Sequence, residues 1–211
     1  MSLKLISLRG TLCSAVIGLL LIACNPNSST TQNPTANQPD RGKDTAYSIS
    51  HGRYLVTIAG CNDCHSPKKF TPQGPVVDSA RLLSGHPAGL PLASFDVVAL
   101  TPGHWMLMAP DLTTYVGPWG ISYATNLTPD NATGMGGWTE DVFIKTMRTG
   151  KHLGLDNGRP ILPPMPWDEI AKWNDQDLRS VYRYLHSLPP IRNHVPEPVS
   201  PQEAAKLATK K

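Results

Sequence analysis

The chain has 211 residues, 4 of them cysteines, with 19 basic and 16 acidic residues and a formal net charge of +3. Lys4 and Arg9 lie at the very start, so loss of a leader there would leave 17 basic against 16 acidic residues. Recognition of nucleic acid requires a strongly basic surface. The composition therefore gives no reason to expect nucleic acid as a partner.

The first residues have the pattern of an export signal. The basic start is followed by an apolar run, Leu12–Ala23, which is shorter than the about 20 residues of a transmembrane helix. We therefore predict a signal peptide over residues 1–23. Its end, Leu-Ile-Ala-Cys, resembles a bacterial lipobox, which implies that Cys24 is lipidated; an ordinary signal peptide with a chance cysteine is the alternative.

Three further segments follow the signal. Residues 24–46 are mostly Asn, Ser, Thr, Pro and Gln, too polar to form a core, and are expected to be a flexible lipidated tether. Residues 47–190 have the length of a single domain. Residues 191–211 are expected to be a polar, loosely packed C-terminal tail, with one helical turn at 204–208.

Three segments of the domain are predicted to be helical. The first covers about 50–60, where Tyr54, Leu55 and Ile58 form an apolar stripe. The second follows Thr139, a good N-cap, and ends near Gly150. The third begins after Asn174 or Asp175 and stops before the proline pair 189–190.

The remaining part of the domain predicts little regular structure. Residues 66–125 form a long insertion rich in proline and glycine. Within it, Trp105–Met108 is expected to pair with Tyr115–Tyr123 as a small β-hairpin. The expected fold class is therefore mainly α, with a long Pro/Gly-rich insertion and a small hairpin.

The residues Cys61-Asn62-Asp63-Cys64-His65 form the most specific pattern in the sequence. Cys-x-x-Cys-His is typical of covalent c-type heme attachment. Two thiols at this spacing can bond the two vinyl groups of one heme, and the imidazole of the next residue is a good axial ligand for its iron. The pattern predicts one covalent heme c held by Cys61, Cys64 and His65.

Other uses of these cysteines are weaker alternatives. A thioredoxin-like redox pair belongs beside a strand–helix unit, and no such pattern is present here. A zinc site would require four ligands, whereas Cys61, Cys64 and His65 offer three. Since Cys13 leaves with the signal and Cys24 takes the lipid, a disulfide would have to join Cys61 to Cys64.

Met165 is the best candidate for the sixth ligand of the iron. It lies in the sequence Pro163-Pro164-Met165-Pro166, just before the last helix of the domain, and the prolines stiffen the loop that carries it. Met135, in a glycine-rich segment, and a histidine are the alternatives. Met147, inside the second helix, is expected to pack in the core.

Ligation by His65 and Met165 favours a carrier of single electrons rather than an enzyme. Sulfur raises the reduction potential relative to two histidines, and an iron with both axial positions filled leaves none for oxygen or peroxide. The alternative is a heme enzyme, or a sensor of gas or peroxide, whose sixth ligand is easily displaced. A third reading is a heme subunit of a dehydrogenase complex.

Taken in order, the helix, Cys-x-x-Cys-His, the methionine in a proline-bearing loop and the aromatic C-terminal helix resemble the class I mono-heme cytochrome c family. The block Ala124–Asp130, with Leu162–Trp167, is similar to cytochrome c subunits of bacterial alcohol and aldehyde dehydrogenases. The resemblance covers about residues 50–190. It implies a cytochrome c fold, in which Gly52 and Tyr54 of the first helix meet Tyr182 and Leu185 of the last.

The resemblance also implies partners and a place in the cell. We expect a dehydrogenase, an oxidase or another cytochrome as redox partner, and attachment by lipid to the periplasmic face of a bacterial membrane. Asn25 is not the aspartate expected for inner-membrane retention, which favours the outer membrane. By analogy, Trp138, Arg148 and Trp167 are candidate donors to the heme propionates.

Two departures limit the comparison. Such dehydrogenase subunits often carry two or three heme motifs, whereas this chain has one. The insertion is also long, and its aromatic residues are expected to cover the heme or, as an alternative, to form a docking surface; they are Trp105, Tyr115, Trp119 and Tyr123.

Overall fold

The computed structural model describes residues 41–208, without the side chains of residues 41–44, 46 and 47. The predicted signal peptide, Cys24 and the tether up to residue 40 lie outside the described residues. The helices are α1 (Arg41–Ile58), α2 (Cys61–His65), α3 (Glu140–Thr149), α4 (Trp167–Ile170), α5 (Asp175–Ser187) and α6 (Pro201–Leu207). None of the helices within this range combines the length and apolarity of a bilayer-spanning segment.

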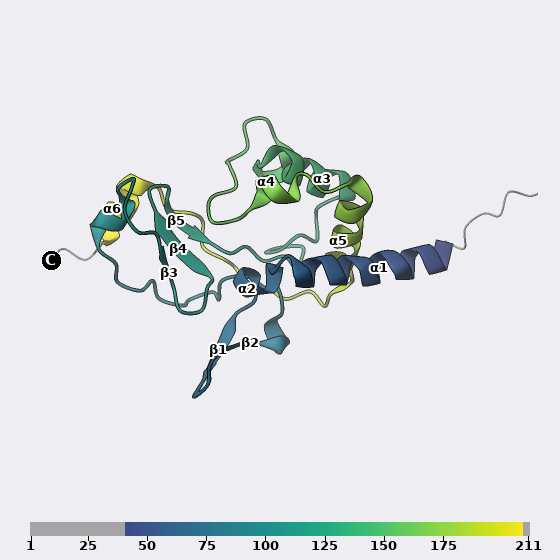
Figure 1. The fold of residues 1–211 in the computed structure, drawn as a ribbon, viewed down its shortest axis with the longest axis horizontal. Helices are drawn as coiled ribbons and strands as arrows, with labels where there is room; N and C mark the ends of the chain where they lie inside the picture. The colour runs from purple at the N-terminus through teal and green to yellow at the C-terminus, as the bar shows by residue number, and fades with distance from the viewer. Residues whose placement is uncertain (1–40, 209–211) are drawn as a thin grey trace, which may run out of the picture. The chain divides into compact units, whose positions relative to one another are not determined.

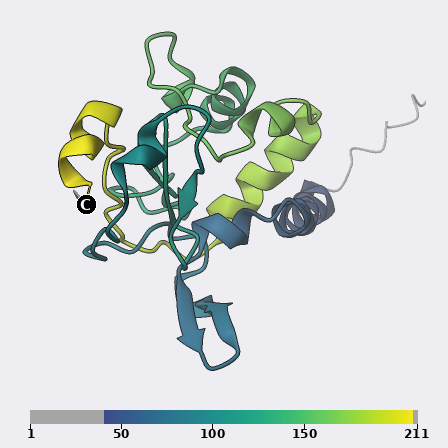
Figure 2. The same cartoon turned by 60° about the vertical axis from the view of Figure 1, so that its left-hand side comes forward.

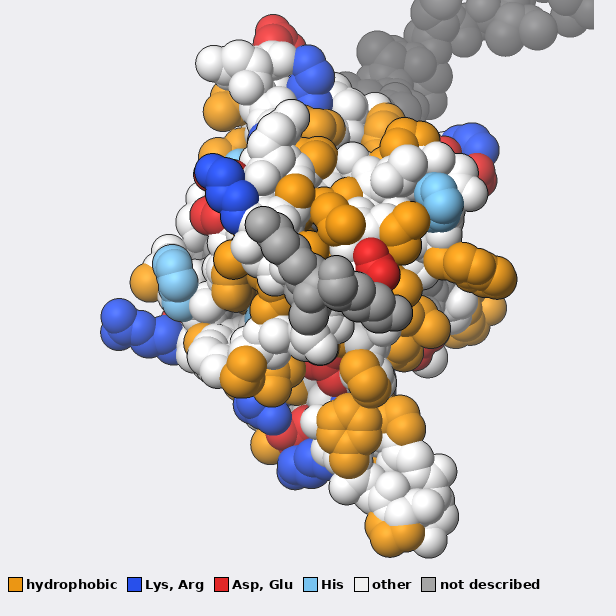
Figure 3. Space-filling model, turned by 90° about the vertical axis from the view of Figure 1, so that its left-hand side faces the viewer, with side chains coloured by type: hydrophobic (Ala, Val, Ile, Leu, Met, Phe, Trp, Pro, Cys, Tyr) orange, Lys and Arg blue, Asp and Glu red, His pale blue; other side chains and the backbone are white. Residues whose placement is uncertain are grey.

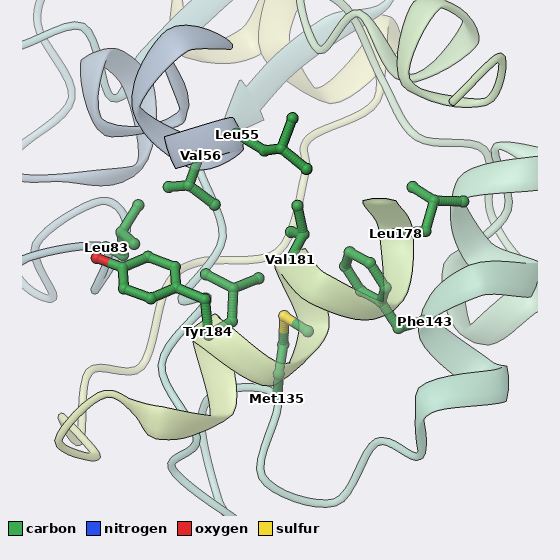
Figure 4. Close-up of a cluster of buried hydrophobic side chains, with 9 residues drawn as sticks. Leu55, Val56, Leu83, Met135, Phe143, Leu178, Val181 and Tyr184 are labelled. Atoms are coloured by element: carbon green, nitrogen blue, oxygen red, sulfur yellow. The ribbon is translucent and has the colours of Figure 1, made fainter. Parts of the chain in front are cut away.

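Helices α1, α3 and α5 enclose the larger hydrophobic core (Figure 1). Helix α1 crosses α5 at Gly52, where a Cβ atom would lie 1.9 Å from the carbonyl oxygen of Ser180. The crossing therefore requires a glycine at this position of α1. Figure 4 shows the side chains that fill the core beside it; the buried members are Leu55, Val56, Leu83, Met135, Phe143, Leu178, Val181, Tyr184 and Leu185.

The helix boundaries follow from capping residues. The Thr139 side chain accepts a hydrogen bond from the Val142 N–H at the start of α3, and Gly150 ends that helix in the left-handed conformation. Asn174 caps α5 in the same way, through the Asp177 N–H. The second and third predicted helices are confirmed. The first begins at Arg41 instead of about residue 50, so it includes the last residues of the predicted tether.

Two small antiparallel sheets lie in the segment that follows α2. Strands β1 (Lys68–Thr71) and β2 (Gly74–Val77) form a hairpin that extends away from the helices (Figures 1 and 2). Strands β3 (Leu107–Met108), β4 (Thr114–Gly117) and β5 (Gly120–Tyr123) form the second sheet in that order. The predicted pairing is present only in part, since Leu107 and Met108 lie opposite Val116 and Tyr115 of β4. The rest of the predicted second strand turns back on itself to form β5.

The mainly-α fold class predicted from the sequence is wrong. The residues between α2 and α3 form the two sheets, together with the 3-10 helices Ser79–Arg81 and Val97–Leu100. A second hydrophobic cluster, separate from the helical core, joins β4 and β5 to the C-terminal helix; its buried members are Phe95, Ala99, Val116, Ile121 and Ala204. Residues 41–208 therefore have a mixed α and β fold with two hydrophobic clusters.

The C-terminal segment packs against the second sheet instead of forming a loose tail. Val199 pairs with Ile121 of β5, and two backbone hydrogen bonds of 2.9 Å join them. Ala204 of α6 has no exposed surface, and Gly120 leaves room for the Val199 carbonyl, which would lie 2.0 Å from a Cβ atom. These contacts cover the edge of β5.

The α1–α5 crossing can be tested with one added methyl group. Gly52→Ala is expected to lower the free energy of unfolding by about 2 kcal/mol, because the steric conflict with Ser180 outweighs the better helix propensity of alanine. Urea unfolding measures the change. Gly137→Ala is the control, since a Cβ atom there meets nothing within 4 Å; equal stability of the two variants would contradict the crossing.

Candidate cofactor-attachment site

Helix α2 is a single short turn whose start is fixed by Gly60. This glycine has φ 68° and separates α1 from α2, a conformation that other residues adopt only with strain. The turn places Cys61 and Cys64 three positions apart, so their side chains lie on one side of the helix. Both thiols are free and partly buried. Two free thiols on one side of a turn can both bond to the same planar cofactor.

The His65 ring is held in one orientation and one tautomer. Its side chain is buried, and Nδ1 lies 2.8 Å from the carbonyl oxygen of Thr125. A carbonyl can only accept, so Nδ1 carries the proton and Nε2 is free to bind a metal. Burial lowers the pKa of His65, which favours the neutral imidazole that iron requires.

The segment around Thr125 reaches the helix because Gly85 permits a close approach. Gly85 has φ 80°, and a Cβ atom there would lie 2.6 Å from the carbonyl oxygen of Ala124. The Gly85 N–H donates to the His65 carbonyl at 2.7 Å, and the His86 N–H donates to the Ala124 carbonyl at 2.8 Å. Two segments that are distant in sequence, residues 85–86 and 124–125, therefore meet at His65 and fix it through backbone groups.

The environment of the two cysteines differs. Burial raises the pKa of Cys61 to about 11, so this thiol stays protonated at neutral pH. Cys64 Sγ lies 2.9 Å from the Tyr115 hydroxyl oxygen of β4. That hydroxyl donates to the Leu112 carbonyl at 2.6 Å, which fixes its position beside the thiol. The Lys68 side chain donates hydrogen bonds to carbonyl groups at the end of α2, with Nζ 2.8 Å from the Asp63 carbonyl oxygen and 2.5 Å from that of Ser66.

Met135 and Met165, the two methionines considered as the sixth ligand, lie in different environments. Met135 is 3% exposed and packs in the helical core (Figure 4). Met165 is partly exposed in the loop before α4. That loop is tied to β5, because the Ser122 hydroxyl donates to the Pro163 carbonyl at 2.6 Å.

The alternative histidine ligands have other contacts. His51 Nε2 pairs with Asp177 at 2.7 Å. His86 is buried, with Nδ1 2.8 Å from the Thr113 hydroxyl, and His152 stacks edge-on against Trp138. His104 lies on the exposed segment after the 3-10 helix Val97–Leu100.

The proposed propionate donors serve the packing of the helices. Arg148 of α3 donates to the Ala171 carbonyl and pairs with Asp175 at 2.6 Å, which ties α3 to the start of α5. The Trp167 ring lies against Gly150, where a Cβ atom would be 2.5 Å from the indole. Each of these side chains therefore has a structural partner within the chain.

The aromatic residues of the insertion, which were expected to cover the heme together, have different surroundings. Trp105 is 88% exposed, whereas Tyr115 contacts Cys64 and Trp119 packs on Gly117. Tyr54 is also exposed rather than part of the helix crossing. On the face in Figure 3, hydrophobic side chains lie among separate basic and acidic ones.

Sequence reasoning missed the residues that orient the site. Tyr115 was noted only as an aromatic residue, and Ser122 gave no signal at all. Thr125 acts through its backbone carbonyl, which leaves no trace in residue type. Its position in the Ala124–Asp130 block was the one available indication that this stretch lies at the site.

The residues present fit a covalent heme. Two thiols share one side of a turn, and the imidazole that follows them is neutral and oriented by a backbone carbonyl, as is common for metal-bound histidine. Within residues 41–208, no group of three or more His, Cys, Asp and Glu side chains is arranged to hold a metal ion by itself. The site has the donor set of a c-type cytochrome.

Comparison with known proteins finds relatives that are cytochrome c subunits of dehydrogenases. The chain is 28% identical over 144 residues to the gluconate 2-dehydrogenase cytochrome c subunit of Pantoea cypripedii, a match that covers 68% of this chain and 24% of that protein. It is 35% identical over 83 residues to the cytochrome c subunit of the quinone alcohol dehydrogenase of Gluconobacter oxydans, covering 38% of this chain and 17% of the relative.

A third relative matches a longer stretch. The fructose dehydrogenase cytochrome subunit of Gluconobacter japonicus is 27% identical over 167 residues, which cover 79% of this chain and 25% of that protein. The chain thus spans at most a quarter of the length of these relatives. No family model matches the chain. The similarity to cytochrome c subunits of bacterial dehydrogenases, predicted from the sequence, is confirmed.

The burial of Cys61 predicts slow alkylation of the heme-free protein. In a Cys64→Ser variant, the rate with iodoacetamide should rise with pH to a midpoint well above 9.0 in the folded state, because the thiolate is the nucleophile and burial disfavours it. In urea the midpoint should return toward the ordinary value of 9.0. A native midpoint near 9.0 would mean that Cys61 is not buried in this way.

Proposed function

We propose that this chain carries one covalent heme c and passes single electrons between protein partners. The thiols of Cys61 and Cys64 bind the porphyrin, and His65 and Met165 are the two axial ligands. The heme supplies an iron that changes by one electron. The observation that carries the proposal is the hydrogen bond from His65 Nδ1 to the Thr125 carbonyl.

The chain's own residues give the site its chemistry. The Thr125 carbonyl keeps the proton on Nδ1 and increases the electron density that the imidazole offers through Nε2. Burial of His65 keeps the ring neutral. Met165 would supply a thioether ligand, which would favour the ferrous state and raise the reduction potential relative to two histidines.

The contacts of β5 support the pairing of His65 with Met165. Thr125 receives the His65 hydrogen bond, and Ser122 binds the loop that carries Met165. Thr125 lies three positions after Ser122, just beyond the end of β5, or about 10 Å along an extended chain at roughly 3.3 Å per residue. One short stretch of chain therefore touches the segments of both ligands.

The partner in this proposal is a redox protein, of which a dehydrogenase is the first candidate. The relatives are cytochrome subunits of gluconate, fructose and alcohol dehydrogenases. By this analogy, the heme accepts electrons from a dehydrogenase or delivers them to an oxidase or another cytochrome. The chain itself then acts as an electron-transfer subunit and does not catalyse the oxidation.

The proposal includes a lipid anchor at Cys24, after removal of residues 1–23. The anchor holds the heme domain, residues 47–190 with the C-terminal segment 191–211, at the periplasmic face of a bacterial membrane. Several acyl chains anchor a protein firmly, since each buried methylene contributes about 0.8 kcal/mol. Asn25 favours the outer membrane.

Replacement of Met165 tests the sixth ligand. Met165→Ala is expected to abolish the near-infrared sulfur-to-iron charge-transfer band of the ferric protein and to permit rapid carbon monoxide binding to the ferrous form. Met108→Ala is the matched control, because Met108 is 66% exposed, and its spectra should equal those of the native protein. A band that survives in Met165→Ala would remove this residue from the site.

The same spectra decide between a carrier and a heme enzyme or sensor. Negligible carbon monoxide binding by the native ferrous protein at neutral pH agrees with a carrier, because both axial positions are filled. Fast binding would favour the enzyme or sensor. Attachment itself is tested by heme staining of the denatured chain, which should disappear when Cys61 and Cys64 are both replaced by serine.

A further inference from the structure

Several parts of the insertion touch the proposed site, and three of the contacts come from the hairpin β4–β5 and the residues just after it. The Tyr115 hydroxyl contacts Cys64, and the Thr125 carbonyl accepts from His65. The third contact is different, because Ser122 reaches a loop 41 residues further along the chain. That loop carries Met165.

The direction of the Ser122 hydroxyl is determined by its two neighbours. Trp119 Nε1 lies 3.2 Å from Ser122 Oγ, and an indole nitrogen can only donate. The Pro163 carbonyl lies 2.6 Å away on the other side and can only accept. The hydroxyl proton therefore points at Pro163, in a residue that is 7% exposed and shielded from competing water.

The Trp119 ring is itself fixed. Gly117 lies against it, and a Cβ atom at this position would be 2.4 Å from the indole ring. The absence of a side chain on Gly117 allows the ring to lie flat on the β4–β5 turn and to direct Nε1 at Ser122. Two consecutive hydrogen bonds, from Trp119 to Ser122 and from Ser122 to Pro163, therefore connect the sheet to the loop.

The loop has few other restraints of this kind. Pro163, Pro164 and Pro166 have no N–H group. The Met165 N–H makes only a local contact, 3.4 Å from the Leu162 carbonyl. Within the described residues, the bond from Ser122 is the hydrogen bond that joins residues 162–166 to another part of the fold.

We propose that Ser122 is a positioning residue for the sixth ligand. It holds the Pro163 carbonyl against β5, so that Met165, two residues later, is presented to the iron rather than withdrawn from it. This inference rests on the proposed function, in which Met165 is that ligand. If the bond from Ser122 to Pro163 forms only when Met165 is bound to the iron, it increases the population in which Met165 is bound.

The test measures how easily an added ligand replaces Met165. Imidazole binding to the ferric, heme-loaded protein at neutral pH should be roughly fivefold tighter in Ser122→Ala, since the loss of one hydrogen bond increases the population with an open iron position. The methionine charge-transfer band should remain, with reduced intensity. Ser122→Thr keeps the hydroxyl and should restore the native affinity.

Ser187→Ala is the matched control. Its hydroxyl also donates to a carbonyl, that of Tyr184 at 2.7 Å, but near the end of α5. This variant should bind imidazole as the native protein does, even if its thermal stability falls. A general loosening of the fold would instead move the imidazole affinity of both variants together, which would contradict the specific role of Ser122.

A second variant covers the case in which Ser122→Ala does not fold. Trp119→Phe keeps an aromatic ring but removes the N–H group that donates to Ser122. Imidazole affinity should therefore rise, by a smaller factor than in Ser122→Ala. Native affinity in whichever of the two variants folds would overturn the inference. If Met165→Ala then binds imidazole much more tightly, ligation by Met165 stands and only the role of Ser122 is wrong. If Met165→Ala also binds imidazole as the native protein does, ligation by Met165 and the role of Ser122 are both wrong.

Discussion

The hydrogen bond between His65 and the Thr125 carbonyl joins two parts of the chain that are 60 residues apart. It sets the imidazole tautomer and the plane of the ring, and it requires the Thr125 segment to lie against α2. That close approach depends on Gly85, whose missing side chain leaves room for the backbone of residues 124–126. Without these contacts the two cysteines would still lie on one turn, but the imidazole beside them would have no fixed direction.

This constraint explains why a long insertion can be tolerated next to a cofactor site. The insertion leaves from Ser66 and returns at Thr125, so both of its ends are anchored at His65. Between these points the β1–β2 hairpin extends outward, while β4 and β5 remain beside the site. Additional chain of this kind costs little closure entropy once its ends are held.

The sequence was sufficient where local rules act. Thr139, Gly150 and Asn174 mark the helix ends through capping, and the Cys-x-x-Cys-His motif locates the site. It was insufficient where distant segments meet. Strands of two to four residues give little periodicity, and Ile121 becomes part of a sheet edge that is completed by Val199. The polar stretch before Ile49 gave no apolar pattern either, so the early start of α1 was missed.

The position of Val199 has a consequence for the order of assembly. The Cys-x-x-Cys-His motif is synthesised early, but β5, which leads into the Thr125 segment that orients His65, gains its last edge partner only when residues near 199 are available. Ala204, fully buried beneath the same sheet, comes later still. In a polypeptide truncated before residue 199, β5 would therefore lack a hydrogen-bonded neighbour on one side, and the sheet beside the two thiols would be incomplete.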